Sequence, residues 1–158
     1  MRTVLLFLIL LVLLVIPAQN QASDEMFSDL KDQSGVTTMS FSKNVIDMLE
    51  LLLDKTDSEH QQQVTGSLKE IRLTICNKEN EKAVNQLMNA LSKSPFQQVE
   101  MAEENDLMVF VHRRRKNINE CHVLFDGDTR KILISFLGEF RVEDMAAIKK
   151  SARQLADN

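Results

Sequence analysis

The chain has 158 residues, of which 44% are hydrophobic and 27% are charged. This length and composition suit one folded domain and exclude a disordered or low-complexity chain. The formal net charge is −4, and Trp and Tyr are both absent. An acidic chain without these stacking residues is a poor candidate for binding nucleic acid, sugars or an anionic membrane surface.

The amino terminus carries the pattern of a secretory signal peptide. Arg2 precedes an unbroken apolar run from Val4 to Ile16, and Pro17 and Ala18 follow it. The run is shorter than the ~20 residues that span a bilayer, but it suits the apolar region of a signal peptide. Cleavage is expected near Ala18 or Ala22; an uncleaved anchor is the alternative interpretation.

The chain therefore divides into a signal peptide over residues 1–22 and a single α+β domain over residues 23–158. Removing the leader takes away Arg2 and no acid, so the net charge becomes 18 − 23 = −5. We expect a periplasmic or secreted protein with no stable membrane span after the signal is removed.

The first half of this domain alternates short strands and helices. Residues 23–33 form a polar lead-in with one or two helical turns, and 36–41 alternate as a strand. Ser42 caps a helix that extends to residue 53, and 54–67 form a surface loop. A strand over 68–75 precedes a helix with Asn77 as its N-cap, and Pro95 ends that helix. Its buried stripe is Val84, Leu87, Met88 and Leu91.

The second half is a run of strands joined by turns. Strands are predicted over residues 97–101, 107–114, 120–125 and 131–137, with turns at 103–106, 115–119 and 126–128. Gly138 is expected to end the last strand. A final helix follows, with Met145, Ile148, Ala152 and Leu155 as its buried stripe.

The predicted fold is α+β, in the order β-α-β-α-β-β-β-β-α, with a mostly antiparallel sheet and helices packed on one face. Several strands are apolar on both faces; in one of them Val109 and Val111 oppose Met108 and Phe110. An uncovered sheet face would be a binding surface or a dimer interface. The alternative is that the helices and the lead-in cover everything.

Four segments resemble a known family. They are GVTTMSFSKNVIDML from Gly35, SLKEIRLTICNKE around Ile71, DLMVFVHRRRKNINECHVLF, and ILISFLGEFRVEDMAAIKK. In order and spacing they are similar to the bacterial envelope family catalogued as domain of unknown function 4252, from about Met26 to Ser151. The family often has an aromatic-acidic-leucine segment where this chain has Pro95 to Val99. The resemblance implies an exported small α+β domain, and it supplies no catalytic or binding residues.

Two cysteines form a candidate disulfide. Cys76 leaves one predicted strand and Cys121 enters another, and an exported chain meets oxidising conditions. A bond would stabilise the fold by roughly 4 kcal/mol on the chain-entropy model. Alternatively, each cysteine is a small buried hydrophobe with a free thiol.

The hairpin between the predicted strands 107–114 and 120–125 carries histidines and a basic run. If its turn is centred on Asn117, His112 and His122 face each other, and we interpret them as structural or solvent-facing rather than as metal ligands. Arg113, Arg114 and Arg115, with the next lysine, form a solvated tip, in which Arg114 is expected near Glu120. Contact with an acidic protein partner is the functional interpretation of this tip.

No motif for catalysis, metal binding or a cofactor is found. We therefore predict a non-enzymatic envelope protein without cofactors, whose partner is an unknown envelope protein or a second copy. The alternative function is a carrier of a small apolar ligand such as a lipid, in a cavity lined by some of the eight Met residues.

Overall fold

The computed structural model describes residues 21–45, 68–99 and 107–157. Four predicted features lie outside the described residues: the signal peptide up to residue 20, most of the helix over 42–53, the loop over 54–67 and the turn over 103–106. The helices are α2 (Asp24–Lys31), α5 (Glu81–Leu91), the 3-10 turn η1 (Val142–Asp144) and α6 (Met145–Asp157). The strands are β1 (Val36–Ser42), β2 (Leu68–Asn77), β3 (Gln97–Val99), β4 (Leu107–Arg114), β5 (Asn117–Asp126) and β6 (Arg130–Phe140).

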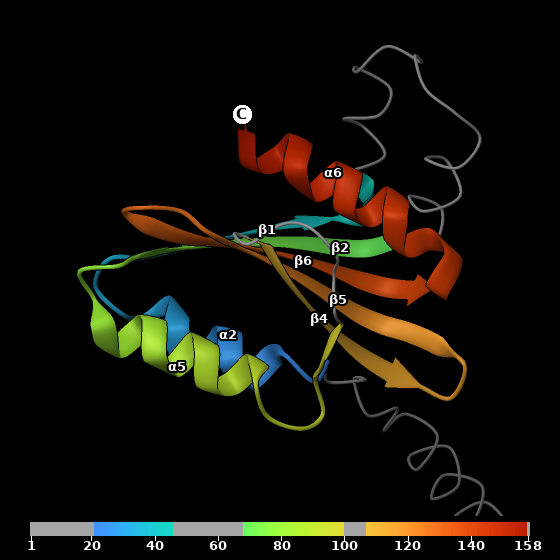
Figure 1. The fold of residues 1–158 in the computed structure, drawn as a ribbon, viewed down its shortest axis with the longest axis horizontal. Coiled ribbons are helices and arrows are strands. Elements are labelled where there is room, and N and C mark those ends of the chain that lie inside the picture. The colour runs from blue at the N-terminus through green and yellow to red at the C-terminus, as the bar shows by residue number, and fades with distance from the viewer. Residues whose placement is uncertain (1–20, 46–67, 100–106, 158) are drawn as a thin grey trace, which may run out of the picture.

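The six strands form one antiparallel sheet in the order β1-β2-β6-β5-β4-β3 (Figure 1). The hairpins β4–β5 and β5–β6 follow the chain, whereas β2 pairs with β6 from the far end of the sequence. The predicted α+β class and antiparallel sheet are confirmed.

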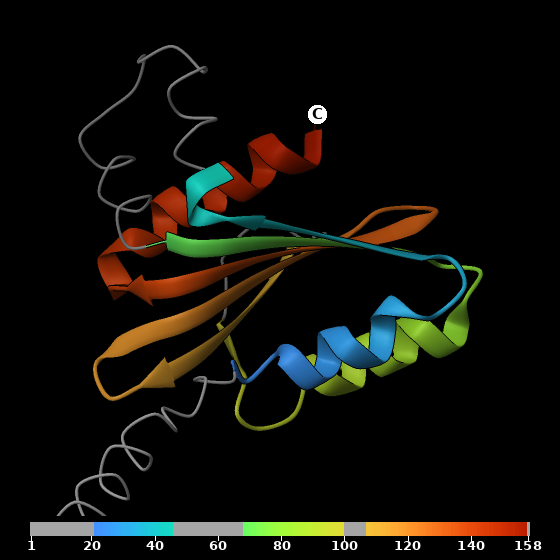
Figure 2. The ribbon, with the colours of Figure 1, turned by 180° about the vertical axis from the view of Figure 1, so that it is seen from behind.

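Helices cover both faces of this sheet, not one face as expected. α2 and α5 lie on one side and α6 lies on the other, as Figure 1 and the reverse view in Figure 2 show. The side chains accordingly form two separate apolar clusters, one on each side of the sheet. The physical reason is that the central strands are apolar on both faces, and each face must be shielded from water.

The register of β5 and β6 shows how these two faces are built. Leu124 lies opposite Leu133 and joins the cluster under α2 and α5, while the adjacent pair Val123 and Ile134 joins the cluster under α6. All four side chains are fully buried. Because side chains alternate along a strand, each polar residue on β5 also has a defined side.

Two helices dock on the first face. α2 buries Met26, Phe27 and Leu30. α5 is preceded by Asn80, whose side-chain oxygen accepts a hydrogen bond from the Ala83 amide at 3.1 Å. The N-cap is therefore Asn80 and not Asn77, which instead accepts from the Glu79 amide. Figure 2 shows α2 and α5 side by side below the sheet.

The end of the chain departs from the prediction in two places. β6 continues through Gly138, which lies opposite Leu68, and ends at Phe140, so Gly138 does not end the strand. On α6, Ile148 and Ala152 are fully buried, but Leu155 is 49% exposed. Leu155 lies in the last turns of α6, and it is not part of the buried stripe.

Candidate functional site

The predicted basic tip is an exposed two-residue hairpin. Arg113 lies opposite Ile118 and Arg114 opposite Asn117, so Arg115 and Lys116 alone form the turn. The turn is thus shorter than the predicted 115–119. Arg113, Arg114, Arg115 and Lys116 are all exposed, and among the described residues none of them forms an ion pair.

Arg115 has a left-handed backbone conformation. Its φ is 61°, and it is the one residue other than glycine with positive φ in the described part of the chain. A side chain at this φ costs about 1 kcal/mol relative to glycine. Glycine or asparagine would suit the turn better. The backbone of the turn therefore does not explain why an arginine stands there.

Further cations lie at the same end of the sheet. Lys43, Lys69 and Arg141 are exposed and line an open groove of about 510 Å³. Asn117, at the base of the hairpin, lines the same groove, as do Glu139 and Asp144. We call the set of Arg113, Arg114, Arg115, Lys116, Lys43, Lys69 and Arg141 the basic end.

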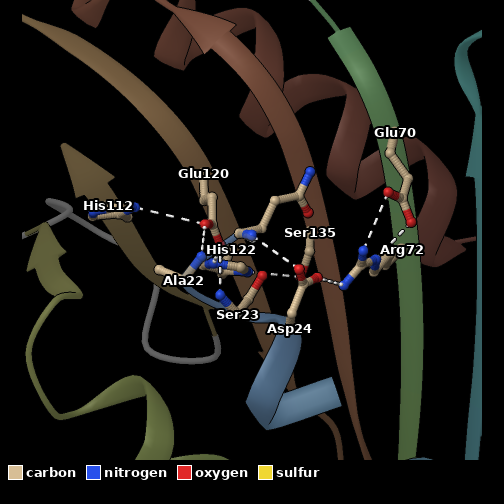
Figure 3. A network of polar contacts seen from close by, with 10 residues as sticks. Ala22, Ser23, Asp24, Glu70, Arg72, His112, Glu120, His122 and Ser135 are labelled. Carbon is tan, nitrogen blue, oxygen red and sulfur yellow. Dashed lines mark hydrogen bonds and ion pairs between the residues drawn. The ribbon is translucent and has the colours of Figure 1, made fainter. Parts of the chain in front are cut away.

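A buried polar cluster lies under the amino-terminal end of α2 and was not predicted. We call it the Glu120 cluster; it consists of Glu120, His112, His122, Ser135 and the backbone amides of Ala22 and Ser23. Figure 3 shows it from close by. The Glu120 carboxylate is only 2% exposed. It accepts hydrogen bonds from the backbone amides of Ala22 at 2.5 Å and Ser23 at 3.1 Å. A carboxylate at this position suits the positive end of a helix.

Two histidines flank this carboxylate. The Nε2 atom of His122 lies 3.3 Å from Glu120, and the Nδ1 atom of His112 lies 3.6 Å from it. Neither contact has the geometry of a good hydrogen bond, so the two amides are the main donors to Glu120. His122 Nδ1 lies 2.7 Å from the Ser135 hydroxyl oxygen, and Phe96 packs edge-on against both imidazoles.

This register corrects two expectations. His112 lies opposite Glu120, and His122 lies opposite Phe110, so the histidines are diagonal neighbours rather than a facing pair. Glu120 contacts the start of α2 and the histidines instead of Arg114. The reason is the tight turn, together with an irregularity of pairing between His112 and Arg113.

Ion pairs of Arg72 connect the start of α2 to β2 on the other side of the cluster. Arg72 on β2 contacts Asp24 at 2.9 Å and Glu70 at 2.6 Å. Its guanidinium also lies 4.8 Å from the centre of the Phe27 ring. The first turn of α2 is therefore held to the sheet by carboxylate, guanidinium and aromatic contacts at once. Figure 3 shows the contacts of Arg72 with Asp24 and Glu70.

The environment sets the charge of these groups. Burial alone would raise the pKa of Glu120, but the contacts with His122, Ser23 and Ala22 outweigh it and lower that pKa to about 2. Burial lowers the pKa of His122, with the neighbouring Glu120 acting in the opposite direction. Glu120 is therefore an anion at neutral pH, and His122 is a neutral imidazole.

Ser135, His122 and Glu120 contact one another in sequence, as the residues of a catalytic triad do, but their side chains are not accessible to solvent. Ser135 and His122 are fully buried, and the hydroxyl contacts the imidazole nitrogen that faces away from Glu120. A substrate would need access to the serine oxygen. The arrangement holds α2 against the sheet, and in the described structure it offers a substrate no access. Among the described residues, no group of three His, Cys, Asp or Glu side chains could hold a metal ion.

The two cysteines are free thiols on opposite sides of the sheet. Cys76 belongs to the cluster under α2 and α5, and Cys121 belongs to the cluster under α6. The sheet separates them, so the candidate disulfide is not formed in this structure. Burial raises the pKa of Cys76, and it raises that of Cys121 to about 12, so both are protonated at neutral pH.

A thiol assay can check this assignment. In the native protein neither buried cysteine should react with Ellman's reagent over minutes, because thiolate and access are both lacking. In denaturant without any reductant, both Cys76 and Cys121 should react. Finding no reactive thiol in the denatured, unreduced protein would mean that the bond exists.

The family model described as domain of unknown function (DUF4252) matches residues 27–148, which is more than half of the chain. The chain belongs to the DUF4252 family. No curated protein and no solved structure matches the chain.

The DUF4252 match runs from Phe27 in α2 to Ile148 in α6. It includes all six strands and reaches the helices on both faces. In the segment from Pro95 to Val99, where this chain departs from the family's usual pattern, Phe96 is 8% exposed and packs on the histidines of the Glu120 cluster. Among the described residues of this DUF4252 chain, no helix is long and apolar enough to cross a membrane.

A pH titration of stability tests the assigned charges. The pKa of His122 lies below its ordinary 6.5, so the unfolded chain takes up that proton first as the pH falls below 6.5. The pKa of Glu120 is about 2 in the folded state against an ordinary 4.5, so further stability is lost from 4.5 downwards. The free energy of unfolding, from urea denaturation, should therefore decrease steadily between about pH 7 and about pH 4. Constant or rising stability on acidification would contradict both assignments.

Proposed function

We propose that this protein is exported to the periplasm or the extracellular space, where it binds an acidic segment of another protein through the basic end. In this proposal it acts as a non-enzymatic interaction module. The apolar leader from Val4 to Ile16 supports export. The exposed hairpin tip supports the binding surface, and Arg115 is the observation that carries it.

Arg115 occupies a backbone conformation that is costly for its residue type. A residue held at φ 61° with an exposed side chain gains nothing from packing. Strained positions of this kind persist where the side chain has a use. Here the side chain extends a run of four cations at the tip of the β4–β5 hairpin, and an arginine fork suits carboxylate groups on a partner.

The contrast between the negative net charge of the chain and the cations of the basic end makes this end selective for acidic partners. Without its leader the chain has a net charge of 18 − 23 = −5, while seven cations gather at the basic end. An acidic partner is therefore repelled by the molecule at large and attracted at one end. Such an arrangement orients the encounter and discriminates between partners.

The carrier alternative has less support. A carrier of a small apolar ligand needs an enclosed apolar cavity. The groove at the basic end and a second groove beside α2 and α5 are both open to solvent. The second, of about 650 Å³ and lined by residues of α2 and α5, includes Glu25, Asp29 and Lys93. Polar side chains of this kind do not suit a lipid tail.

Crosslinking in intact cells tests the proposal. A photoactivatable residue replaces Lys116 at the basic tip, or Asp128 in the hairpin at the opposite end of the sheet as a matched control. We expect a reproducible adduct with an acidic protein from position 116 and none from position 128. Equal adducts from both positions, or none from either, would contradict the proposal. An adduct with twice the mass of the chain would make the partner a second copy.

Replacing Arg115 by glycine separates the energetic cost of its backbone conformation from the contribution of its side chain to binding. The Arg115→Gly variant should be more stable by about 0.5–1 kcal/mol, because glycine adopts positive φ freely. The same variant should give less of the adduct from position 116. Thermal unfolding followed by circular dichroism gives the first quantity. Lower stability together with undiminished crosslinking would show that Arg115 serves the fold alone.

A further inference from the structure

β1 forms one edge of the sheet, and within the described residues no strand pairs with its outer side (Figure 1). Proteins commonly protect such edges from other chains with charged residues, proline, bulges or a very short strand. The opposite edge has this protection, because β3 is only three residues long. β1 has seven residues, VTTMSFS, with no charge, no proline and no shift of register against β2. It therefore remains open to pairing.

The hydrogen bonds at the start of β1 show which backbone groups point outward. The Asn77 amide donates to the Gly35 carbonyl at 2.9 Å. Bonded residues alternate along an antiparallel pair, and β1 keeps one register against β2 throughout. The odd-numbered residues of β1 therefore bond to β2. The even-numbered residues direct their amides and carbonyls to the outer side, and they are Val36, Thr38, Ser40 and Ser42.

These outward groups are complementary to a second copy of themselves. The Val36 amide already donates to the Gln33 carbonyl at 3.2 Å, so only its carbonyl is open to a partner. When two copies of β1 lie antiparallel, the outward amides of Thr38, Ser40 and Ser42 match the outward carbonyls of Ser40, Thr38 and Val36, in that order. We propose that two copies of the chain pair in this way, with the two-fold axis at Met39, the central residue of β1.

The side chains at this axis favour a second copy over an unrelated strand. Met39 is 41% exposed although it is a large apolar residue. It lies on the same face as Phe41, which packs against the cluster under α6. In the dimer the two Met39 side chains contact and shield each other. Lys43 lies opposite Gly35 of the second copy, so no like charges meet along the uncharged strand.

This inference goes beyond the proposed function and does not depend on it. The tip from Arg113 to Lys116 joins β4 and β5, and β2, β6 and β5 separate it from the β1 edge. A dimer formed through β1 therefore presents two tips and covers neither. Failure of the β1 pairing would leave binding at the basic end untouched.

A disulfide trap tests the pairing. The full chain carrying Met39→Cys is purified, oxidised by air at neutral pH and analysed on a non-reducing gel. Residues opposed at such an axis have Cα atoms ~4.5 Å apart, within reach of a disulfide. We expect most of the chain to become a covalent dimer. The native Cys76 and Cys121 are buried and should not compete.

The matched control for this trap is Thr37→Cys on the same face. In the proposed register the two copies of this residue lie about 13 Å apart along the strands, too far for a disulfide. Thr37→Cys should therefore stay monomeric. No covalent dimer from Met39→Cys, or an equal yield from both variants, would overturn the inference.

A charge at the axis gives an independent check without any crosslink. Met39→Lys places two ammonium groups opposite each other, which opposes pairing, whereas Met39→Leu keeps the axis apolar. Size-exclusion chromatography with light scattering over a dilution series measures the mass. The wild type and Met39→Leu should reach twice the monomer mass at high concentration, and Met39→Lys should remain a monomer with an unchanged circular dichroism spectrum. A wild type that is monomeric throughout, or a Met39→Lys dimer as populated as that of the wild type, would contradict the pairing.

Discussion

Replacing Glu120 by glutamine is expected to lower the free energy of unfolding by about 3 kcal/mol, as is typical when one partner of a buried charge network is removed. Glutamine has one acceptor oxygen, so its amide NH₂ would face one of the two amides that now donate to the carboxylate. It also removes the negative charge at the amino-terminal end of α2. Urea denaturation at neutral pH, followed by circular dichroism, measures the loss.

The matched control is the same change at an exposed site. Glu139 lies at the solvent-exposed end of β6, where it accepts a hydrogen bond from the Asn117 side chain. The Glu139→Gln variant should change the free energy of unfolding by no more than about 0.5 kcal/mol. If the two variants lose the same amount, Glu120 does not hold α2 in the way described.

Replacing Leu30 by alanine is expected to cost a similar amount, about 3 kcal/mol, in the free energy of unfolding. Leu30 is fully buried and joins the cluster formed with Leu124 and Leu133 of the sheet. The change removes apolar contact and leaves a cavity under α2. The same urea denaturation measures it.

Leu155 provides the control for this second variant. It lies on α6 and is 49% exposed, so Leu155→Ala should cost less than about 1 kcal/mol. A Leu30→Ala variant as stable as Leu155→Ala would mean that α2 is not packed on the sheet.

Local patterns predicted the strands well because hairpins and alternation act over short distances. The strand over 107–114 and the one that begins at residue 36 have the predicted starts. β5 begins earlier than predicted, at Asn117, because its turn is formed by Arg115 and Lys116 without the glycine that marks such turns. β6 passes Gly138 because the pairing with Leu68 and the burial of Phe140 continue the strand.

The layering of the helices depends on contacts that are distant in sequence. Pairing of β2 with β6 places the two halves of the chain in one sheet, and no local pattern indicates it. The strands that are apolar on both faces were a sign that both faces need a cover. The cysteines show the same limit: alternation gives the side of each within its own strand, but the two strands are not adjacent, because β6 lies between β2 and β5.

The Glu120 cluster could be predicted only in part. Glu120, His122 and Leu124 alternate along one face of β5, so a charged residue in a strand that is apolar on both faces was a signal for a buried charge. Its partner could not be read from the sequence. The Ser23 amide lies 97 residues away along the chain.

If the protein binds its partner through the basic end, the arginines at the tip are required. The decisive quantity is the yield of the position-116 crosslink in a chain whose three arginines, Arg113, Arg114 and Arg115, are all glutamine. We expect this variant to lose the adduct while its free energy of unfolding stays within about 1 kcal/mol of the wild type. An undiminished adduct from this stably folded, charge-neutralised tip would contradict it.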